Sequence, residues 1–507
     1  MSELPNHSLQ VALTWLSGEP DGDIDAELAD LCRYVEDADG WLLSAAARQE
    51  LLGLFCQRAF DVCGRFRPAL LTCELPVPAE LHAKATVLNG ILLSVSRQLQ
   101  ALYEEVRYRK LWPRQADLSG LSDLSHRVHS ETYLLSILLG AAAPFGLWQR
   151  IHAVWRMSGQ IERLRHGETG AKPSKSHLRY KRLLAIAVSQ TESLTAREQQ
   201  WLFDYLEPLA REVLLSLVPP RPAASAYWFD PKQDMPPVAC VRRLPEKEND
   251  VVYLSLAGIV HRTGAQILWL EKRLFDLDAS ARSSGDTSLL ERVEASVPAL
   301  PLGLTPLEIL SLLRRLRERW AAAPERGEAR SRQHYTVQVC AGLKSVWAMG
   351  RESAAMADEW TVYNESPGGY GILCVGDDVY HALSAGMVLA LRRESMREWA
   401  ICVVRWVRTD SPQQIELGLQ VLGEGFTPVS ICFRGGSALA PALMMQSSVA
   451  ARGNCALVAE AGTYISSHFV LVRENENLYI AQGQALGLAM QTARIELFQY
   501  EIDHYSK

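Results

Sequence analysis

No two of the ten cysteines in this 507-residue chain have the C-x-x-C spacing. This absence excludes a zinc ribbon and a disulfide framework, so the cysteines are predicted to be small core residues of a protein in a reducing compartment. The first ten residues also lack the basic stretch and the apolar run of a secretory signal. We therefore expect a cytoplasmic location.

An excess of positive charge is missing as well. The chain has 52 Lys and Arg residues against 58 Asp and Glu residues, a formal net charge of −6. This excludes a surface that is basic overall, as in many nucleic-acid-binding proteins, and no nucleic-acid partner is expected. The 48% of hydrophobic and 22% of charged residues are typical of folded domains, several of which fit in this length. Any anion-binding site must therefore be local.

The motifs of common enzymes are absent, since G-x-S-x-G, G-x-x-x-x-G-K-[ST], G-x-G-x-x-G and H-E-x-x-H do not occur. No enzymatic activity is expected, and a hydrolase with an unrecognised site is a remote alternative. The only close histidine pair is His126 and His129, with no cysteine or second carboxylate pair in register. Both are predicted to be exposed helix residues, and no metal is expected.

One run of uncharged residues, 132–148, raises the question of a membrane span. A span needs about 20 apolar residues, and this run is shorter. Gly140, Pro144 and Gly146 also interrupt it. The run is therefore predicted to be a buried helix, and no membrane span is expected.

Residues 1–218 are predicted to form an α-helical domain. Apolar residues in 88–106 recur at spacings of three, four and seven, which is one stripe of an amphipathic helix. Thr195-Ala-Arg-Glu198 has the capping-box pattern, and prolines from residue 219 onward end the helical region. The basic stretch 163–182 is predicted to be an exposed loop, with a docking surface for an acidic partner as the alternative.

Residues 226–276 are predicted to be a small mixed α/β segment, in which three short strands precede a helix at 258–275. Residues 277–303 are richer in Ser, Asp, Gly and Pro and are expected to be a surface connection. Thr305-Pro306-Leu307-Glu308 combines an N-cap, a first-turn proline and a capping glutamate. A connecting helix is therefore predicted at 305–323.

Beyond Pro324 the apolar pattern changes to period two. Residues 324–432 are predicted to form an antiparallel β-barrel, and residues 433–507 a second, C-terminal β module. The whole chain is thus predicted to be a multidomain α+β protein with a helical N-terminal region and two β modules. The predicted strands lie at 335–340, 360–362, 371–375, 388–391, 399–407 and 415–421, and then at 455–459, 468–472, 478–481 and 494–502.

Seven arginines and no lysine lie between residues 314 and 332, against three glutamates. Guanidinium groups bind phosphates and guanine edges through planar, bidentate contacts, whereas lysine would serve for solubility alone. Residues 314–319 are predicted to lie on a solvated helix face. Arg326, Arg330 and Arg332 follow that helix on a loop that enters a barrel strand, where their side chains can close over a ligand.

A second polar segment, Asn364-Glu-Ser-Pro-Gly-Gly369, lies between two predicted strands. Asn364 and Ser366 offer short polar groups that can hydrogen-bond a base or the turn itself. Gly368 and Gly369 permit positive φ and a close backbone approach. Taken alone, the segment predicts a hairpin turn.

Together the two segments have the form R-x-x-x-R before a barrel and (D/N)-x-S-x-x-G between its strands. Arg326-Gly-Glu-Ala-Arg330 and Asn364-Glu-Ser-Pro-Gly-Gly369 resemble this motif pair of the PilZ family of cyclic di-GMP receptors. Residues 401–407 and 416–421 are similar to late barrel strands of that family, and the resemblance covers about 324–432. It implies that the arginines bind phosphates and guanine edges, while Asn364 and Ser366 contact the other guanine. Because Arg330 stands five residues before Tyr335, Arg332 can share or take the second arginine's role.

The resemblance implies a non-enzymatic, cytoplasmic effector that binds cyclic di-GMP. We expect the loop 324–334 to be mobile when empty and to fold over the ligand, which re-orients the preceding helix. The helical region and the second β module would then carry the signal to a protein partner in motility, pili, surface attachment or biofilm formation. The competing hypothesis is an adaptor with a degenerate barrel that binds proteins without nucleotide.

Overall fold

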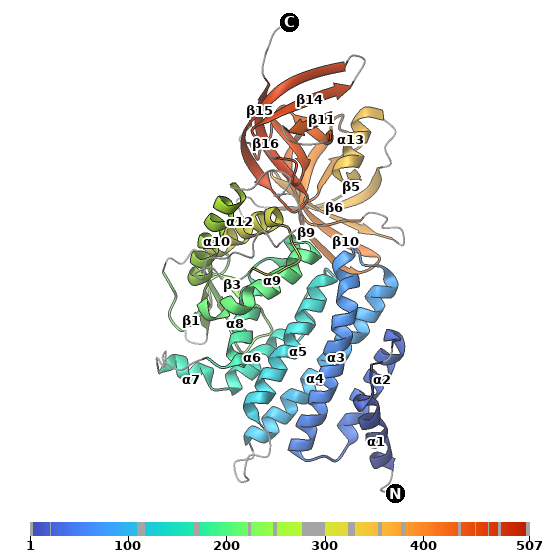
Figure 1. Cartoon of the computed structure of the whole chain (residues 1–507), viewed down its shortest axis with the longest axis vertical. Helices are drawn as coiled ribbons and strands as arrows, with labels where there is room; N and C mark the ends of the chain where they lie inside the picture. Colours follow the sequence, from blue (N-terminus) through green and yellow to red (C-terminus); the bar gives the residue numbers. More distant parts are fainter. Residues whose placement is uncertain are drawn as a thin grey trace.

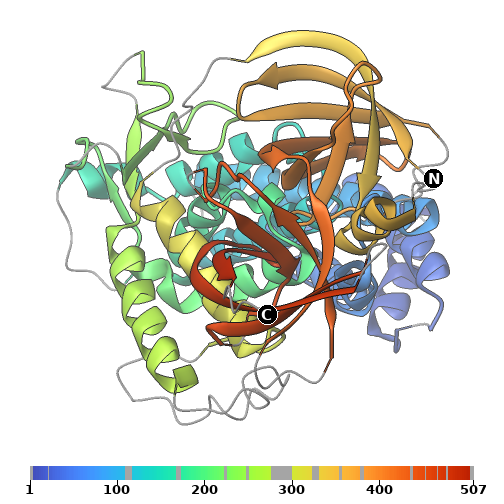
Figure 2. The same cartoon turned by 90° about the horizontal axis from the view of Figure 1, so that it is seen from above.

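Helices and β-barrels occupy opposite ends of the molecule in the computed structural model. Figure 1 shows the helical region at the end that holds the N-terminus and the two barrels at the other end. Viewed from above, the barrels lie side by side over the helices (Figure 2). The residues described are 4–20, 22–108, 117–166, 173–221, 225–246, 251–275, 300–322, 330–352, 357–376, 382–433, 438–451, 453–464, 466–474 and 478–502.

The N-terminal region is helical, as predicted, and packs around α3, α4 and α5. Its core includes the fully buried side chains of Phe55, Leu92 and Trp155. Thr195 caps α9 in the predicted capping box with Glu198. The elements are α1 (Leu4–Ser17), α2 (Ile24–Asp37), η1 (Ala38–Gly40), α3 (Ala45–Thr72), α4 (Ala79–Tyr108), α5 (Leu118–Leu138), α6 (Leu147–Met157), α7 (Gln160–Arg165), α8 (Lys175–Ala187), η2 (Thr191–Ser193), α9 (Ala196–Leu209) and η3 (Ala210–Glu212).

The basic stretch and the histidine pair of the helical region differ from the prediction. Residues 175–182, predicted as part of an exposed loop, begin α8, because the Ser174 side chain caps that helix and Tyr180 is fully buried. His126 and His129, predicted to be exposed, are buried in α5. Within the described residues no group of three or more His, Cys, Asp or Glu could hold a metal ion.

The uncharged run 132–148 spans the end of α5, a turn and the start of α6. Gly140 and Gly146 both have positive φ in that turn, which is why one continuous helix does not form. Most of the run is buried within the helical region. Of the helices in the described ranges, none is long and apolar enough to cross a membrane.

A four-stranded sheet with strand order β1-β4-β2-β3 follows the helical region. The predicted helical domain extends to residue 218, but helical structure ends at Glu212 and the chain then pairs in this sheet as β1. The predicted connection 277–303 lies outside the described residues up to 299, and α12 begins with the predicted capping box at Thr305. The elements are β1 (Leu214–Ser216), β2 (Ala226–Phe229), β3 (Val238–Ala239), β4 (Val252–Ser255), α10 (Ala257–Phe275) and α12 (Pro306–Ala321).

The first barrel closes six antiparallel strands in the order β10-β7-β6-β5-β8-β9. Alternating side chains such as Val337, Val339 and Val362 fill its interior. A helix between its first two strands, α13, had not been predicted. The elements are β5 (Ser331–Ala341), α13 (Leu343–Glu352), β6 (Asp358–Ser366), β7 (Gly369–Val375), β8 (Val388–Arg392), β9 (Ala400–Ser411) and β10 (Gln414–Glu424).

The second barrel closes six strands in the order β11-β12-β13-β16-β15-β14. Strand for strand this pairing repeats that of the first barrel, so the C-terminal half contains the same topology twice. The predicted border at residue 432 places β11 in the wrong barrel, because β11 pairs with β12 and β14. The strands are β11 (Thr427–Phe433), β12 (Ala440–Met445), β13 (Ala456–Glu460), β14 (His468–Glu474), β15 (Leu478–Gln491) and β16 (Ile495–Ile502).

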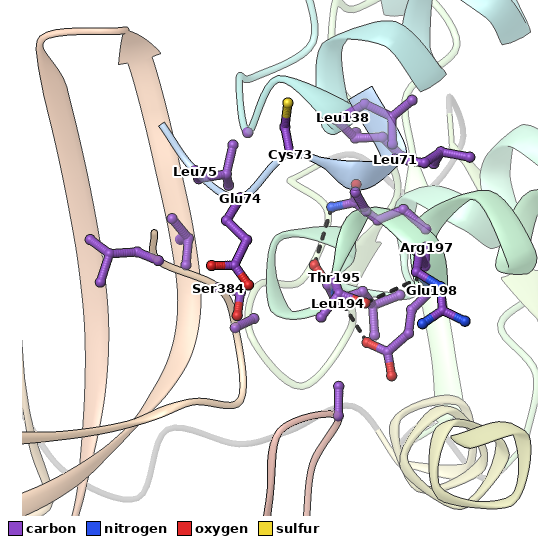
Figure 3. Close-up of a pocket in the computed structure, with 18 of the residues that line it drawn as sticks. Leu71, Cys73, Glu74, Leu75, Leu138, Leu194, Thr195, Arg197, Glu198 and Ser384 are labelled. Carbon is purple, nitrogen blue, oxygen red and sulfur yellow. Dashed lines mark hydrogen bonds between the residues drawn. The ribbon is translucent and has the colours of Figure 1, made fainter. Parts of the chain in front are cut away.

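Buried contacts join the barrels to each other and to the helical region. Ile401 of the first barrel lies in one apolar cluster with Leu497 of the second. Leu75, which follows α3, exchanges two backbone hydrogen bonds of 3.0 and 2.9 Å with Leu383 of the first barrel. Leu75 and Ser384 line a cavity of about 350 Å³ beside this contact, and Figure 3 shows both residues. The first barrel therefore contacts both the second barrel and the helical region. A structural change in the first barrel can reach either of them through these contacts.

Candidate functional site

In the sequence, the three motif arginines come between the end of α12 and the first residues of β5. Arg326 is outside the described residues. Arg330 stands immediately before β5, which begins four residues earlier than predicted, and Arg332 lies inside that strand. Both side chains are exposed, and within the described ranges neither makes a hydrogen bond or an ion pair. Two guanidinium groups are therefore available at the start of β5.

The register of the β5–β6 ladder brings the two motifs together. Arg332 is directly opposite Asn364, and Ser331 is opposite Glu365. Directly opposed residues in an antiparallel pair have Cβ atoms about 5 Å apart. The arginine end of β5 and the polar end of β6 thus form one continuous surface.

The predicted hairpin is present, with Ser366 ending β6 and Gly369 beginning β7. The Ser366 hydroxyl donates to the Gly369 carbonyl at 3.4 Å, and the Val421 amide donates to the Gly368 carbonyl at 3.0 Å. A Cβ atom on Gly369 would lie 2.0 Å from the Leu419 carbonyl oxygen. Gly369 provides the predicted close backbone approach but not the predicted positive φ.

Asn364 is held against β7 with one polar atom unused. A Cβ atom on Gly371, its partner in the ladder, would lie 2.6 Å from both terminal atoms of the Asn364 amide. The buried Oδ1 atom of Asn364 has no hydrogen-bond partner among the described residues. An unpaired buried acceptor is costly, so it suits a ligand that brings an N–H donor.

Tyr363 lies near three charged groups, of which only Arg330 belongs to the motif. Burial and the carboxylate of Glu416 raise the pKa of Tyr363, whereas Arg330 and Arg408 act in the opposite direction. Arg408 and Glu416 are paired across β9 and β10. A second basic group thus joins Arg330 near the polar hairpin.

The acidic residue within the hairpin motif is neutralised by its neighbours. Glu365 accepts hydrogen bonds from the Tyr335 hydroxyl at 2.9 Å and from Arg393 Nη2 at 2.6 Å. Burial and the bond to Glu365 raise the pKa of Tyr335 to about 12, so its hydroxyl stays protonated and donates. With its carboxylate engaged in this way, Glu365 repels an incoming phosphate less strongly.

Tyr363, Arg393 and Arg408 had not been predicted as part of this surface. Arg408 directly follows the predicted strand 399–407, but no local signal says that this strand end meets Tyr363 after the barrel closes. The predicted solvated face of α12 is also wrong in part. Arg315 pairs with the buried Glu198, and Arg319 donates to the Ser189 carbonyl at 3.1 Å.

Taken together, the surface offers exposed guanidinium donors, a short hydroxyl and an unpaired amide oxygen on a rigid hairpin. Guanidinium groups suit phosphates, and an amide oxygen can accept from the N–H groups of a guanine.

Comparisons with known proteins agree with this geometry. The model of the N-terminal domain of the cyclic-di-GMP receptor FimW matches residues 10–222, and the model of its middle PilZ domain matches residues 349–428. The second match includes the whole hairpin motif but none of the three motif arginines. No curated protein and no solved structure matches the chain. Since the two models match, in order, the helical region and most of the first barrel, the chain belongs to the FimW family of cyclic-di-GMP receptors and has its middle PilZ domain.

Proposed function

We propose that this protein is a non-enzymatic effector that binds cyclic di-GMP on the first barrel. The observation that carries the proposal is the pairing of Arg332 with Asn364, which unites the arginine and hairpin motifs on one surface. Arg330 and Arg332 would bind the phosphates and a guanine edge, with Arg326 as the further motif arginine. Asn364 and Ser366 would bind the other guanine, against the close backbone that Gly368 and Gly369 allow.

Isothermal titration of the full chain with cyclic di-GMP tests this proposal. Saturable binding, with no heat from equal concentrations of GMP, is the expected result. If cyclic di-GMP gives no heat at tens of micromolar, the barrel is a degenerate one, and an adaptor that binds only proteins is the remaining function.

Gly371→Ala tests the site without removing any of its polar groups. The added methyl group would displace the Asn364 amide, because only 2.6 Å is available there. We expect the affinity for cyclic di-GMP to fall by about 1 kcal/mol, roughly fivefold. Titration of Gly487→Ala is the matched control, since nothing lies within 4 Å of the methyl group added there. Equal affinities of the two variants would show that Asn364 does not contact the ligand.

The signal would leave the barrel through α12. The last turn of α12 is tied to the helical region, because Trp320 Nε1 donates to Ser189 Oγ at 2.9 Å. The predicted ordering loop, 324–334, lies outside the described residues up to 329. A ligand that fixes Arg330 would fix the end of this short connection and so constrain α12. For a single site this coupling is limited to about 1 to 3 kcal/mol.

Hydrogen exchange tests the relay independently of binding. We expect cyclic di-GMP to protect amides in 330–334 and 360–370, and also amides in 305–320. Protection confined to the first two ranges would leave the binding site intact but remove the relay through α12. A pull-down from cytoplasmic extract with and without nucleotide would then identify the partner, which we propose belongs to a motility, pilus or surface-attachment system.

A further inference from the structure

A basic cavity, separate from the motif surface, lies where three parts of the molecule meet. It has a volume of about 480 Å³, which is within the range of small-molecule sites. Helix α12 forms one wall, β9 of the first barrel another, and β15 of the second barrel a third. None of the motif residues from Arg330 to Gly369 lines it.

Four arginines and one glutamate supply the charge of this cavity. Arg314 forms an ion pair of 2.8 Å with Glu271, and Arg315 pairs with Glu198. Neither glutamate lines the cavity. Arg319 has only a backbone carbonyl as its hydrogen-bond partner, and Arg405 makes no hydrogen bond with the described residues. Glu318, an exposed residue, is the single acidic side chain of the wall. Positive charge therefore remains uncompensated inside the cavity.

Two further observations indicate that the cavity is built to bind a polar ligand. Ser311 is 4% exposed and lines the cavity, yet its hydroxyl has no hydrogen-bond partner among the described residues. The same holds for Nε of Arg315. Buried polar atoms are seldom left unpaired, because each unpaired group costs about 1 to 3 kcal/mol.

The backbone also directs Arg405 to this place. The pairing of β9 with β10 shifts register between Val404 and Trp406, so Arg405 is the extra residue of a bulge. Bulges re-aim side chains and are frequent beside binding sites. Partial burial and the charges of Arg315 and Arg405 lower the pKa of Arg319 to about 10, which an anion in the cavity would reverse.

We propose that this cavity binds a phosphate-bearing small molecule of about mononucleotide size, at a site separate from the cyclic di-GMP surface. Arg319 and Arg405 bind the phosphate groups, and the Ser311 hydroxyl donates to them. The body of the ligand packs on the apolar wall formed by Leu488 and Met490. Because the walls belong to α12 and to both barrels, an occupied cavity links all three.

Titration of the full chain with ADP and with inorganic pyrophosphate tests this site. We expect both probes to bind, and Arg405→Ala to weaken each of them by at least about tenfold, the usual loss for a charge-assisted contact. Arg405 is exposed and without hydrogen bonds, so the variant is expected to keep the thermal unfolding temperature of the parent. If that temperature falls, Ser311→Ala gives the same test through a smaller change, with an expected loss of about fivefold.

Two controls separate this site from general charge and from the motif surface. Arg243→Ala removes an exposed arginine that pairs with Glu246 and should leave both affinities unchanged. Arg330→Ala should weaken cyclic di-GMP alone. The proposal is overturned if neither probe binds at millimolar concentration, if Arg405→Ala and Ser311→Ala bind as the parent does, or if saturating cyclic di-GMP displaces ADP.

Discussion

Lowering the pH from 7 to 4 is expected to reduce the free energy of unfolding of the helical region by several kcal/mol. The cause is a set of buried neutral histidines. His126 Nδ1 is 2.8 Å from the Ser176 hydroxyl, and His152 lies 2.9 Å from both the Tyr180 hydroxyl and the Met235 carbonyl. Burial lowers the pKa of both imidazoles to about 4.

The direction of the pH effect follows from these values. An unfolded histidine titrates near 6.5, so between pH 6.5 and 4 the unfolded state binds protons that the folded state excludes. The stabilisation is fully present above pH 6.5 and is lost as the pH falls to about 4. The difference between the unfolded and folded pKa values corresponds to a loss of at most about 3 kcal/mol in the free energy of unfolding for each histidine.

Denaturant unfolding at pH 7, 6, 5 and 4, followed by circular dichroism, measures this loss. His152→Gln keeps a donor and an acceptor but does not titrate, so the dependence on pH should become shallower in that variant. A free energy that stays constant from pH 6.5 to 4.5 in the parent would contradict the buried, neutral state of these histidines.

The same histidines show why local sequence patterns were sufficient for some features and insufficient for others. His126 and His129 are three residues apart on α5 with serines nearby, a pattern equally typical of a solvated face. Their partners, Ser176 on α8 and Ser96 on α4, are distant in the sequence. Burial of a polar residue depends on such long-range partners, which no local pattern contains.

Elements with short-range causes were predictable. The capping signals at Thr195 and Thr305 gave the starts of α9 and α12, since each cap is formed within four residues. The hairpin at Ser366 was predictable for the same reason. The barrel that contains β11 was not, because alternation identifies a strand but leaves its hydrogen-bonding partner open. Likewise, Arg408 joins Tyr363 only once β9 and β10 have paired.

Arg330→Ala is expected to weaken cyclic di-GMP binding by about 1 to 3 kcal/mol, or roughly 5- to 150-fold. The guanidinium group is exposed, has no protein partner in the described ranges, and lies near Tyr363 and Arg408. Its removal therefore costs the ligand a charge-assisted contact without breaking a bond of the folded protein. Isothermal titration gives the affinity, and an unchanged unfolding temperature checks the fold.

Comparison with Arg332→Ala and Arg314→Ala shows which arginines contact the ligand. Arg332 faces Asn364 across the ladder, so a larger loss there than at Arg330 would give it the role of the second motif arginine. If Arg332→Ala causes the larger loss and Arg326→Ala leaves the affinity unchanged, the R-x-x-x-R register moves by two residues. Arg314 is engaged with Glu271 on α10 and should leave the affinity unchanged. Equal losses at Arg314 and Arg330 would mean that the ligand senses only bulk positive charge, and the binding surface would then have to be sought away from the hairpin.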